Sequence, residues 1–353
     1  ATAALGSIEM TGYSSDNLSS MVEMVTSGAT AAMGSIQMTG FSSDNLTSMV
    51  EMVTAGATSS LGKITMTGYN ASDLTGMMEK VTAGATASLG KIEMTGYDAS
   101  NLTGMMEKVT AGATAALGSI EMTGYSSDNL AAMVSQVTAG ATSALGDIQM
   151  EGFSSDHITN ITINITISTT NSLSNITMIG FNPENISSDI TNSAASGAWV
   201  GMKNLQSKSS APLISNVTSS TSNGNYNAGK NIFISLNFNK PVNVDNSNGS
   251  PTMILETGST DRLATYSSGT GSTSINFTYT VQSGDVSSDL DVKSNNSLLL
   301  NGATIKSADN ESAILFIPTG VATNSLSSNK AIVVDTLAPT VNSVAISSAS
   351  GVQ

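Results

Sequence analysis

The sequence predicts a multidomain protein in which an N-terminal β/α solenoid with parallel strands is followed by an all-β antiparallel sandwich. Three observations support this prediction. A segment of 28 residues is repeated without insertion through the first half of the chain. Each copy joins an alternating apolar pattern to a helical one. Beyond about residue 210, the repeat gives way to short alternating runs that are separated by prolines.

The repeat defines the first domain. Its copies begin at Ala1, Ala29, Ala57, Ala85, Ala113 and Ala141, and a degenerate seventh copy begins at Thr169. Internal repeats of this length are typical of solenoids, whose terminal copies must cover the last apolar face. We therefore expect a solenoid over residues 1–200, closed by a cap over 141–200, and a linker over 201–210.

The first part of each copy has the strand pattern. The string from Leu5 to Tyr13 reads L-x-x-I-x-M-x-x-Y, and within it Ile8 and Met10 alternate with polar residues. This alternation predicts a short strand with one buried face. Stacked copies would then place parallel strands on one side of the solenoid and helices on the other.

The second part of each copy has the helix pattern. Leu18, Met21, Val22 and Val25 recur at i, i+3, i+4 and i+7, which predicts an amphipathic helix. Gly28 stands where a glycine commonly ends a helix. Copy six breaks the pattern, because HITNITINITIS alternates isoleucine with polar residues where a helix is expected, and we interpret this run as a strand.

The strand pattern and the period resemble leucine-rich repeats of the longer, helix-containing type, over about residues 1–182. A β/α solenoid of independent origin is the alternative. Where that family usually has Asn or Cys, this chain has an aromatic residue, namely Tyr13, Phe41, Tyr69, Tyr97, Tyr125 and Phe153.

The second half resembles a different family. Four ordered blocks, YNAGKNIFISLNFNKPVNV, ATYSSGTGSTSINFTYTVQSGDVSSDLDV, SLLLNGATIKSADNESAILFIP and SLSSNKAIVVDTLAPTV, are similar to the immunoglobulin-like modules strung in tandem in large bacterial and archaeal surface proteins of the adhesin type. The resemblance covers residues 211–337 and implies a β-sandwich with an extracellular spacer or adhesive role. A loose recurrence of APLISNVTSS from Ala338 predicts a second, truncated module over 338–353, and so a fragment of a longer protein.

Composition restricts the function. There are 26 Asp and Glu against 12 Lys and Arg, a net charge of −14, which disfavours nucleic acid and anionic membranes as partners. No apolar run reaches the roughly 20 residues of a membrane helix. With 11% charged residues and no cysteine, the chain has the composition of an extracellular surface protein. His157 is the only histidine, so a conventional histidine-based triad is excluded and we expect no enzyme.

Two groups of residues are candidate sites. The outward positions of the expected strands would form a face for a glycan or protein ligand, with Lys63, Lys91, Glu93, Glu121, Thr67 and Thr95. Oxygen ligands for calcium near the junction of two modules would come from Asp285, Asp289, Asp291, Asp309 and Asp335. Aspartates in turns also commonly accept backbone N–H groups, which is the alternative for this second group.

These observations lead to a functional prediction. The chain is expected to be a non-enzymatic, extracellular structural or adhesive segment of a much larger cell-surface protein, acting as a stiff stalk and spacer. The alternatives are a recognition module that binds its ligand on the strand face, and a subunit that assembles with other copies of itself into a filament or surface layer.

Overall fold

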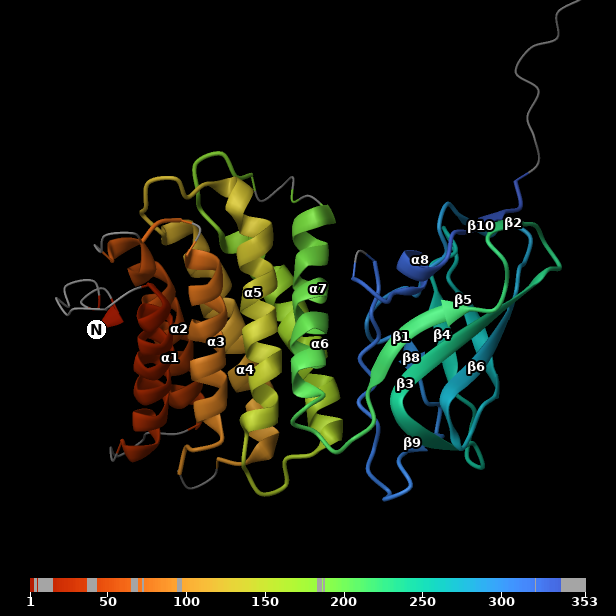
Figure 1. Cartoon of the computed structure of the whole chain (residues 1–353), viewed down its shortest axis with the longest axis horizontal. Helices are drawn as coiled ribbons and strands as arrows, with labels where there is room; N and C mark the ends of the chain where they lie inside the picture. The colour runs from red at the N-terminus through yellow and green to blue at the C-terminus, as the bar shows by residue number, and fades with distance from the viewer. Residues whose placement is uncertain are drawn as a thin grey trace, which may run out of the picture.

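The computed structural model describes residues 1–2, 5, 15–36, 43–64, 69–71, 73–93, 97–182, 186, 188–320 and 322–337 of the chain. Within these residues the N-terminal half consists of helices and the C-terminal half mainly of β-strands, and the two halves lie side by side (Figure 1). No helix in this part of the chain is both long and apolar enough to cross a membrane.

The described part of the helical half contains one α-helix in each repeat copy. These are α1 (Ser15–Ala32), α2 (Ser43–Ser60), α3 (Leu74–Leu89), α4 (Leu102–Ala115), α5 (Leu130–Ser143), α6 (Ser155–Ser172) and α7 (Ser188–Leu205). Their Leu, Met and Val residues, spaced by three and four, bury one face of each helix. Short 3₁₀ helices follow several of them, among them η3 (Leu61–Lys63), η5 (Ala116–Ser119) and η7 (Ala144–Asp147).

The expected β/α solenoid with parallel strands is wrong. In the copies where the segment is described, the residues after the 3₁₀ helix form an extended loop, as at 120–122 and 148–150, and the described sheets include none of them. Ile120 and Ile148 are 6% and 7% exposed, because each inserts into the core between the helices. The alternating residues therefore fill the space at the helix ends, and the fold implied by the leucine-rich-repeat resemblance is not formed.

Consecutive helices run in opposite directions. A tyrosine that precedes a helix donates its hydroxyl to the carbonyl oxygen of a leucine at or just beyond the end of the preceding helix. The three pairs are Tyr69–Leu61 at 3.0 Å, Tyr97–Leu89 at 3.0 Å and Tyr125–Leu117 at 2.9 Å. Each bond holds the end of one helix beside the start of the next. Burial raises the pKa of all three phenols.

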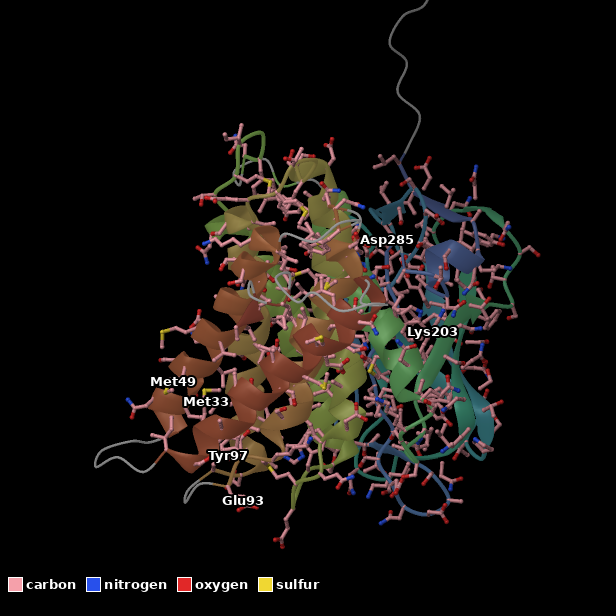
Figure 2. The ribbon with its side chains drawn as sticks, turned by 60° about the vertical axis from the view of Figure 1, so that its left-hand side comes forward. Met33, Met49, Glu93, Tyr97, Lys203 and Asp285 are labelled. Atoms are coloured by element: carbon pink, nitrogen blue, oxygen red, sulfur yellow. The ribbon has the colours of Figure 1, made fainter. Side chains whose placement is uncertain are left out.

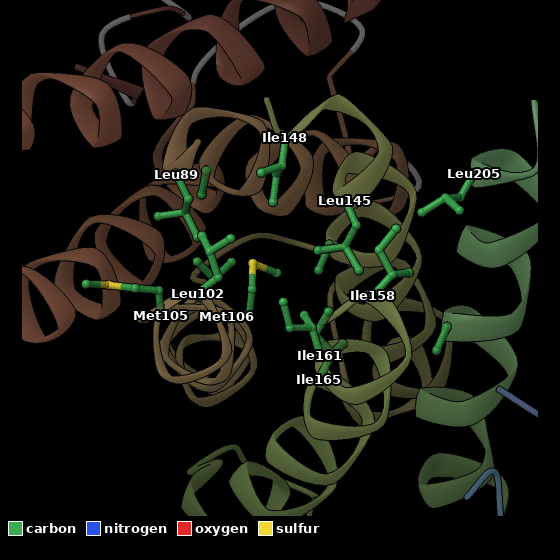
Figure 3. Packing of buried hydrophobic residues seen from close by; sticks show 14 of the residues in the cluster. Leu89, Leu102, Met105, Met106, Leu145, Ile148, Ile158, Ile161, Ile165 and Leu205 are labelled. Carbon is green, nitrogen blue, oxygen red and sulfur yellow. The ribbon is translucent and has the colours of Figure 1, made fainter. Parts of the chain in front are cut away.

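The helices form two layers. In one layer α1, α3, α5 and α7 pack in sequence, and in the other α2 packs on α4 and α4 on α6 (Figure 1). The nearest partner of a helix in its own layer is therefore two repeat copies away. The core fills the space between helices of both layers, as Leu89, Leu102, Met106 and Ile161 do in Figure 3.

Glycine allows the close approach within a layer. A Cβ atom on Gly84 of α3 would collide with the carbonyl oxygen of Glu23 in α1, and one on Gly112 of α4 would collide with that of Glu51 in α2. The expected helix end at this glycine is wrong, since α1 continues through Gly28 to Ala32 and α3 continues through Gly84 to Leu89. The glycine of the repeat is therefore an interior helix position, and in α3 and α4 it is also a packing position.

The run HITNITINITIS, interpreted above as a strand, belongs to helix α6. Ile158, Ile161 and Ile165 are buried on one side of this helix, whereas Ile167 is 48% exposed. Packing of that side in the core therefore outweighs the β propensity of the isoleucines. His157, the first residue of this run, completes a capping box at the start of α6, where its Nδ1 accepts from the backbone N–H of Ser154 at 3.2 Å.

The β half contains ten described strands and one short helix. They are β1 (Ile214–Ser219), β2 (Gly224–Tyr226), β3 (Asn231–Asp245), β4 (Thr252–Leu255), β5 (Arg262–Ser268), β6 (Ser272–Thr280), β7 (Val286–Ser287), β8 (Leu298–Leu299), β9 (Thr304–Lys306), α8 (Leu326–Asn329) and β10 (Ile332–Asp335). The larger sheet is antiparallel, with the order β1-β3-β6-β5-β4-β8 and β9 on β3. A smaller sheet has the order β2-β10-β7.

The expected immunoglobulin-like sandwich is corrected to a curled, half-barrel sheet. Strand β3 causes the curl, since its first part pairs with β6 and its last part with β9. The register shifts between Asn237 and Val242, next to Pro241, which has no N–H to give to the ladder. Alternate residues of β3, such as Ile234 and Leu236, enter the core enclosed by the sheet.

The connection between the halves is short. Helix α7 extends to Leu205, into the segment 201–210 that was expected as a linker, and β1 begins at Ile214. Backbone hydrogen bonds fix the residues between them, including one from Lys208 N to Leu205 O at 2.8 Å. Residues 338–353, expected to begin a second module, lie outside the described residues.

Candidate functional site

The residues expected on a single strand face lie at two opposite ends of the helices. Lys63 and Glu121 belong to the α2–α3 and α4–α5 connections, whereas Lys91 and Glu93 belong to the α3–α4 connection. Because consecutive helices are antiparallel, the two groups are separated by the length of a helix, about 24 Å for the 16 residues of α3. Glu93 lies beside Tyr97 at one such end in Figure 2. Thr67 and Thr95 lie outside the described residues.

Connections two copies apart are neighbours. A Cβ atom on Gly62 would lie 2.7 Å from the backbone N of Glu121, so the loop with Lys63 packs on the loop with Glu121. Lys63, Lys91, Glu93 and Glu121 are all exposed. The described residues therefore bring Lys63 and Glu121 into adjacent loops and leave Lys91 and Glu93 elsewhere, so the expected continuous face is not formed.

Asp285, the first of the expected calcium ligands, is engaged by protein groups. It is 1% exposed and accepts from Arg262 Nε at 2.7 Å, from the Tyr279 hydroxyl at 2.6 Å and from Gln282 N at 2.8 Å. Burial alone would raise the pKa of Asp285, but the hydrogen bonds from Tyr279, Arg262 and Gln282 hold it below its usual value. This carboxylate links β5, β6 and the turn before β7.

Asp291 has a similar structural position. It is 8% exposed, and it accepts from Val292 N, Gly320 N and the Ser327 hydroxyl, each at 2.8 Å. Burial raises the pKa of Asp291, and these hydrogen bonds partly offset that effect. The carboxylate thereby fastens the loop before α8 to the sheet.

The other three aspartates are exposed. Asp335 accepts from Leu337 N at 3.0 Å, and Asp289 and Asp309 lie in surface loops. The described residues contain no group of three or more His, Cys, Asp or Glu side chains placed to hold a metal ion. Calcium binding therefore stays a prediction from the sequence.

The structure reveals a feature that the sequence reasoning missed, which is a continuous apolar junction between the halves. Trp199 and Met202 of α7 belong to the same buried cluster as Leu213, Ile314 and Phe316 of the β half, and all five are 1% exposed or less. This cluster continues through α6, α4 and α2 toward the far side of the helical half. The helices and one side of the β half therefore share one hydrophobic core.

Polar contacts surround this apolar junction. The Thr159 hydroxyl of α6 accepts from Leu315 N at 3.0 Å, and Lys203 Nζ donates to the Thr323 hydroxyl at 3.3 Å. Lys203 also lies 5.8 Å from the centre of the Trp199 ring, within cation–π range. Figure 2 shows Lys203 on the helix next to the β half.

Two open cavities flank the junction. One, of about 480 Å³, lies between the start of α6, the connection after α7 and residues 310–312, and Asp156, Lys208 and Glu311 give it charges of both signs. The other, of about 560 Å³, lies between α6 and residues 296–301 and is lined by asparagine amides and leucines. The polar side chains that line the two cavities could form hydrogen bonds with a polar molecule. Lys208, in the first cavity, already forms an ion pair with Asp147 at 2.7 Å.

The sequence contained a partial signal for the junction. Trp199, the only tryptophan, lies in the degenerate seventh copy, where the repeat pattern is lost and apolar residues no longer match other copies. A unique large apolar residue at the end of a repeat array indicates a contact outside the array.

Comparisons with protein-family models, with curated proteins and with solved structures find no significant match. The function must therefore be inferred from the molecule itself.

Proposed function

We propose that this chain is a stiff, non-enzymatic structural segment of an extracellular or cell-surface protein, with a spacer or adhesive role. The observation that supports the proposal is the apolar cluster that runs from the helical array into the β half. Two domains joined by a flexible linker would each enclose a separate core. Here Phe316 is fully buried against helices that lie more than 100 positions earlier in the chain.

The architecture fits a mechanical role. Repeat arrays gain length by stacking identical units, each of which contacts only its neighbours. The acidic, cysteine-free composition agrees with the proposed extracellular location. Ligand recognition on a strand face is not carried forward, because the described repeats form no such face.

The test is to loosen the junction and measure the shape of the whole chain. Phe316→Ala removes a fully buried ring from the junction, whereas Val242→Ala removes a comparably buried side chain from the core of the curled sheet. We expect small-angle X-ray scattering to show one compact shape for the unmodified chain and for Val242→Ala, and a broader distribution of distances for Phe316→Ala. A broad distribution for the unmodified chain would refute the proposed stiffness.

A further inference from the structure

Three asparagines of the β half are followed directly by glycine, in the pairs Asn223–Gly224, Asn248–Gly249 and Asn301–Gly302. An asparagine in such a pair can lose its side-chain amide, because the backbone nitrogen of a glycine is uncrowded and can reach the side-chain carbonyl carbon. Asparagine is one of the thermolabile residues for this reason. The surroundings of the three pairs differ, and the differences decide which of them can react in the folded chain.

Asn223 is held on both sides of the reaction. Its side-chain oxygen accepts from Ala331 N at 3.1 Å, and the nitrogen of Gly224 donates to Ala331 O, also at 3.1 Å. These two bonds adjoin the ladder in which β2 pairs with β10. The attacking nitrogen and the carbonyl carbon can therefore meet only when this end of the ladder opens.

The side chain of Asn301 is held as well. Its Nδ2 donates to Ser250 O at 3.1 Å and to the Thr252 hydroxyl at 3.0 Å. Asn301 has a φ of 52°, and its turn is closed by a bond from Ala303 N to Leu300 O at 2.9 Å. The amide that would leave as ammonia is therefore fixed to the start of β4.

Asn248 lacks these restraints. It is exposed, and its side-chain amide forms no hydrogen bond with any other residue that the structure describes. The nitrogen of Gly249 donates only to Asn246 O, at 3.4 Å, which is longer than the usual range of about 2.7–3.2 Å. We propose that Asn248 is a site of spontaneous deamidation in the folded chain, and that the folded structure protects Asn223 and Asn301.

The reaction requires water as its only co-reactant. The nitrogen of Gly249 attacks the Cγ atom of Asn248, the bond from Cγ to the amide nitrogen breaks, and the amide nitrogen leaves as ammonia with the proton of the glycine nitrogen. Water then opens the resulting succinimide ring at either of its two carbonyl groups. One opening gives aspartate, and the other gives isoaspartate, in which the main chain passes through the former side chain. Either product adds a negative charge at this position.

The modified turn would lie against the turn that contains Asn301. A Cβ atom on Gly249 would collide with Asn301 O, and one on Gly302 would collide with Asn248 O, so the two turns pack backbone against backbone. Isoaspartate lengthens the main chain at position 248, and this close packing leaves no space for the added length. We therefore expect the modification to loosen the edge of the larger sheet, where β4 pairs with β8.

Peptide mapping by mass spectrometry tests the proposal on the whole chain. The folded protein is incubated at neutral pH in water enriched in heavy oxygen, which marks product formed during the incubation, and is digested in acid to limit further reaction. We expect Asn248 to be converted at least about fivefold faster than Asn223 or Asn301, which is the effect of one net hydrogen bond. In urea the three rates should become similar, because the restraints on Asn223 and Asn301 are then lost.

Two variants test the cause and the consequence. Thr252→Val removes one acceptor of the Asn301 amide and keeps a β-branched residue in β4, so Asn301 should react up to about fivefold faster while Asn248 keeps its rate. Asn248→Gln removes the reactive pair. After the same incubation, hydrogen exchange at the β4–β8 edge should be faster in the native sequence than in Asn248→Gln.

The proposal is overturned if Asn248 reacts no faster than Asn223 and Asn301 in the folded chain. It is also overturned if the same difference persists in urea, since the sequence alone would then set the rates. An unchanged rate of Asn301 in Thr252→Val would contradict protection by its hydrogen bonds, and equal hydrogen exchange in the two incubated chains would contradict the loosening. These outcomes are independent of the proposed stiffness, because the apolar junction contains neither turn.

Discussion

Replacing Gly112 by alanine tests the glycine contact that sets the spacing of the helical layers. A Cβ atom at this position in α4 would collide with the carbonyl oxygen of Glu51 in α2 and lie 2.8 Å from the Thr54 hydroxyl oxygen. The first obstacle is backbone, which cannot rotate away as a side chain can. To accommodate the methyl group, α4 and α2 must separate and loosen the buried side chains between them.

The magnitude follows from two opposing effects. Overpacking of a close-packed core costs about 1–3 kcal/mol, and an obstacle in the backbone favours the upper end of that range. Alanine recovers about 1 kcal/mol in helix propensity relative to glycine. We therefore expect Gly112→Ala to lower the free energy of unfolding by about 2 kcal/mol, which corresponds to a fall in Tm of roughly 4–8 °C for a helical unit of this size.

Chemical and thermal denaturation followed by circular dichroism would measure this effect against a matched control. Gly56→Ala makes the same substitution at the equivalent position of α2, where no neighbouring helix or loop of the described residues lies within 4 Å of the added Cβ atom, so we expect a gain of up to about 1 kcal/mol. Gly112→Ser should cost less than alanine, because Ser168 holds this position in α6 and donates to the Glu107 carbonyl oxygen at 2.8 Å. Equal effects of Gly112→Ala and Gly56→Ala would refute the packing argument.

The two remaining predictions concern the buried aspartates. The folded pKa of Asp285 lies below its unfolded value of about 3.9, so its stabilising effect is present above that pH and is lost as the pH falls through the folded pKa. Urea unfolding should therefore show Asp285→Asn to be less stable than the unmodified chain at pH 7, with a difference that shrinks below about pH 4; a difference that widens in acid would contradict this reasoning. Asp285 and Asp291 already accept hydrogen bonds from protein groups, so we expect EDTA to leave the Tm of the chain unchanged. A rise in Tm on adding calcium would contradict this expectation and would support a calcium site formed by the exposed aspartates.

The sequence was sufficient to predict the helices of the first five copies, but not α6, α7 or the structure between the helices. The spacing of Leu18, Met21, Val22 and Val25 matches one side of α1. The alternation of Ile120 and Met122 covers only a few residues, and a strand and a loop that inserts one side chain into a core give the same short pattern. In α6, the isoleucines satisfy period two and helical spacing together, and only packing against neighbouring helices decides between them.

The candidate sites show a related limit. The aspartates near residue 285 lie in turns and loops, and the partners of Asp285 and Asp291 come from distant parts of the chain, such as Arg262 and Gly320. The expected face with Lys63 and Lys91 depended on adjacent copies lying side by side. Because copies pack two apart, a period read from the sequence alone could not show which residues are neighbours in space.

The alternating direction of the helices constrains how such an array can change in length. Gain or loss of a single 28-residue copy would reverse the direction of every helix beyond it. The last two helices would then meet the β half in the opposite orientation. The contacts of Trp199 and Thr159 would then be lost, since each depends on a fixed helix polarity. Expansion or contraction of this gene segment by recombination is therefore compatible with the fold only in steps of two copies, about 56 residues at a time.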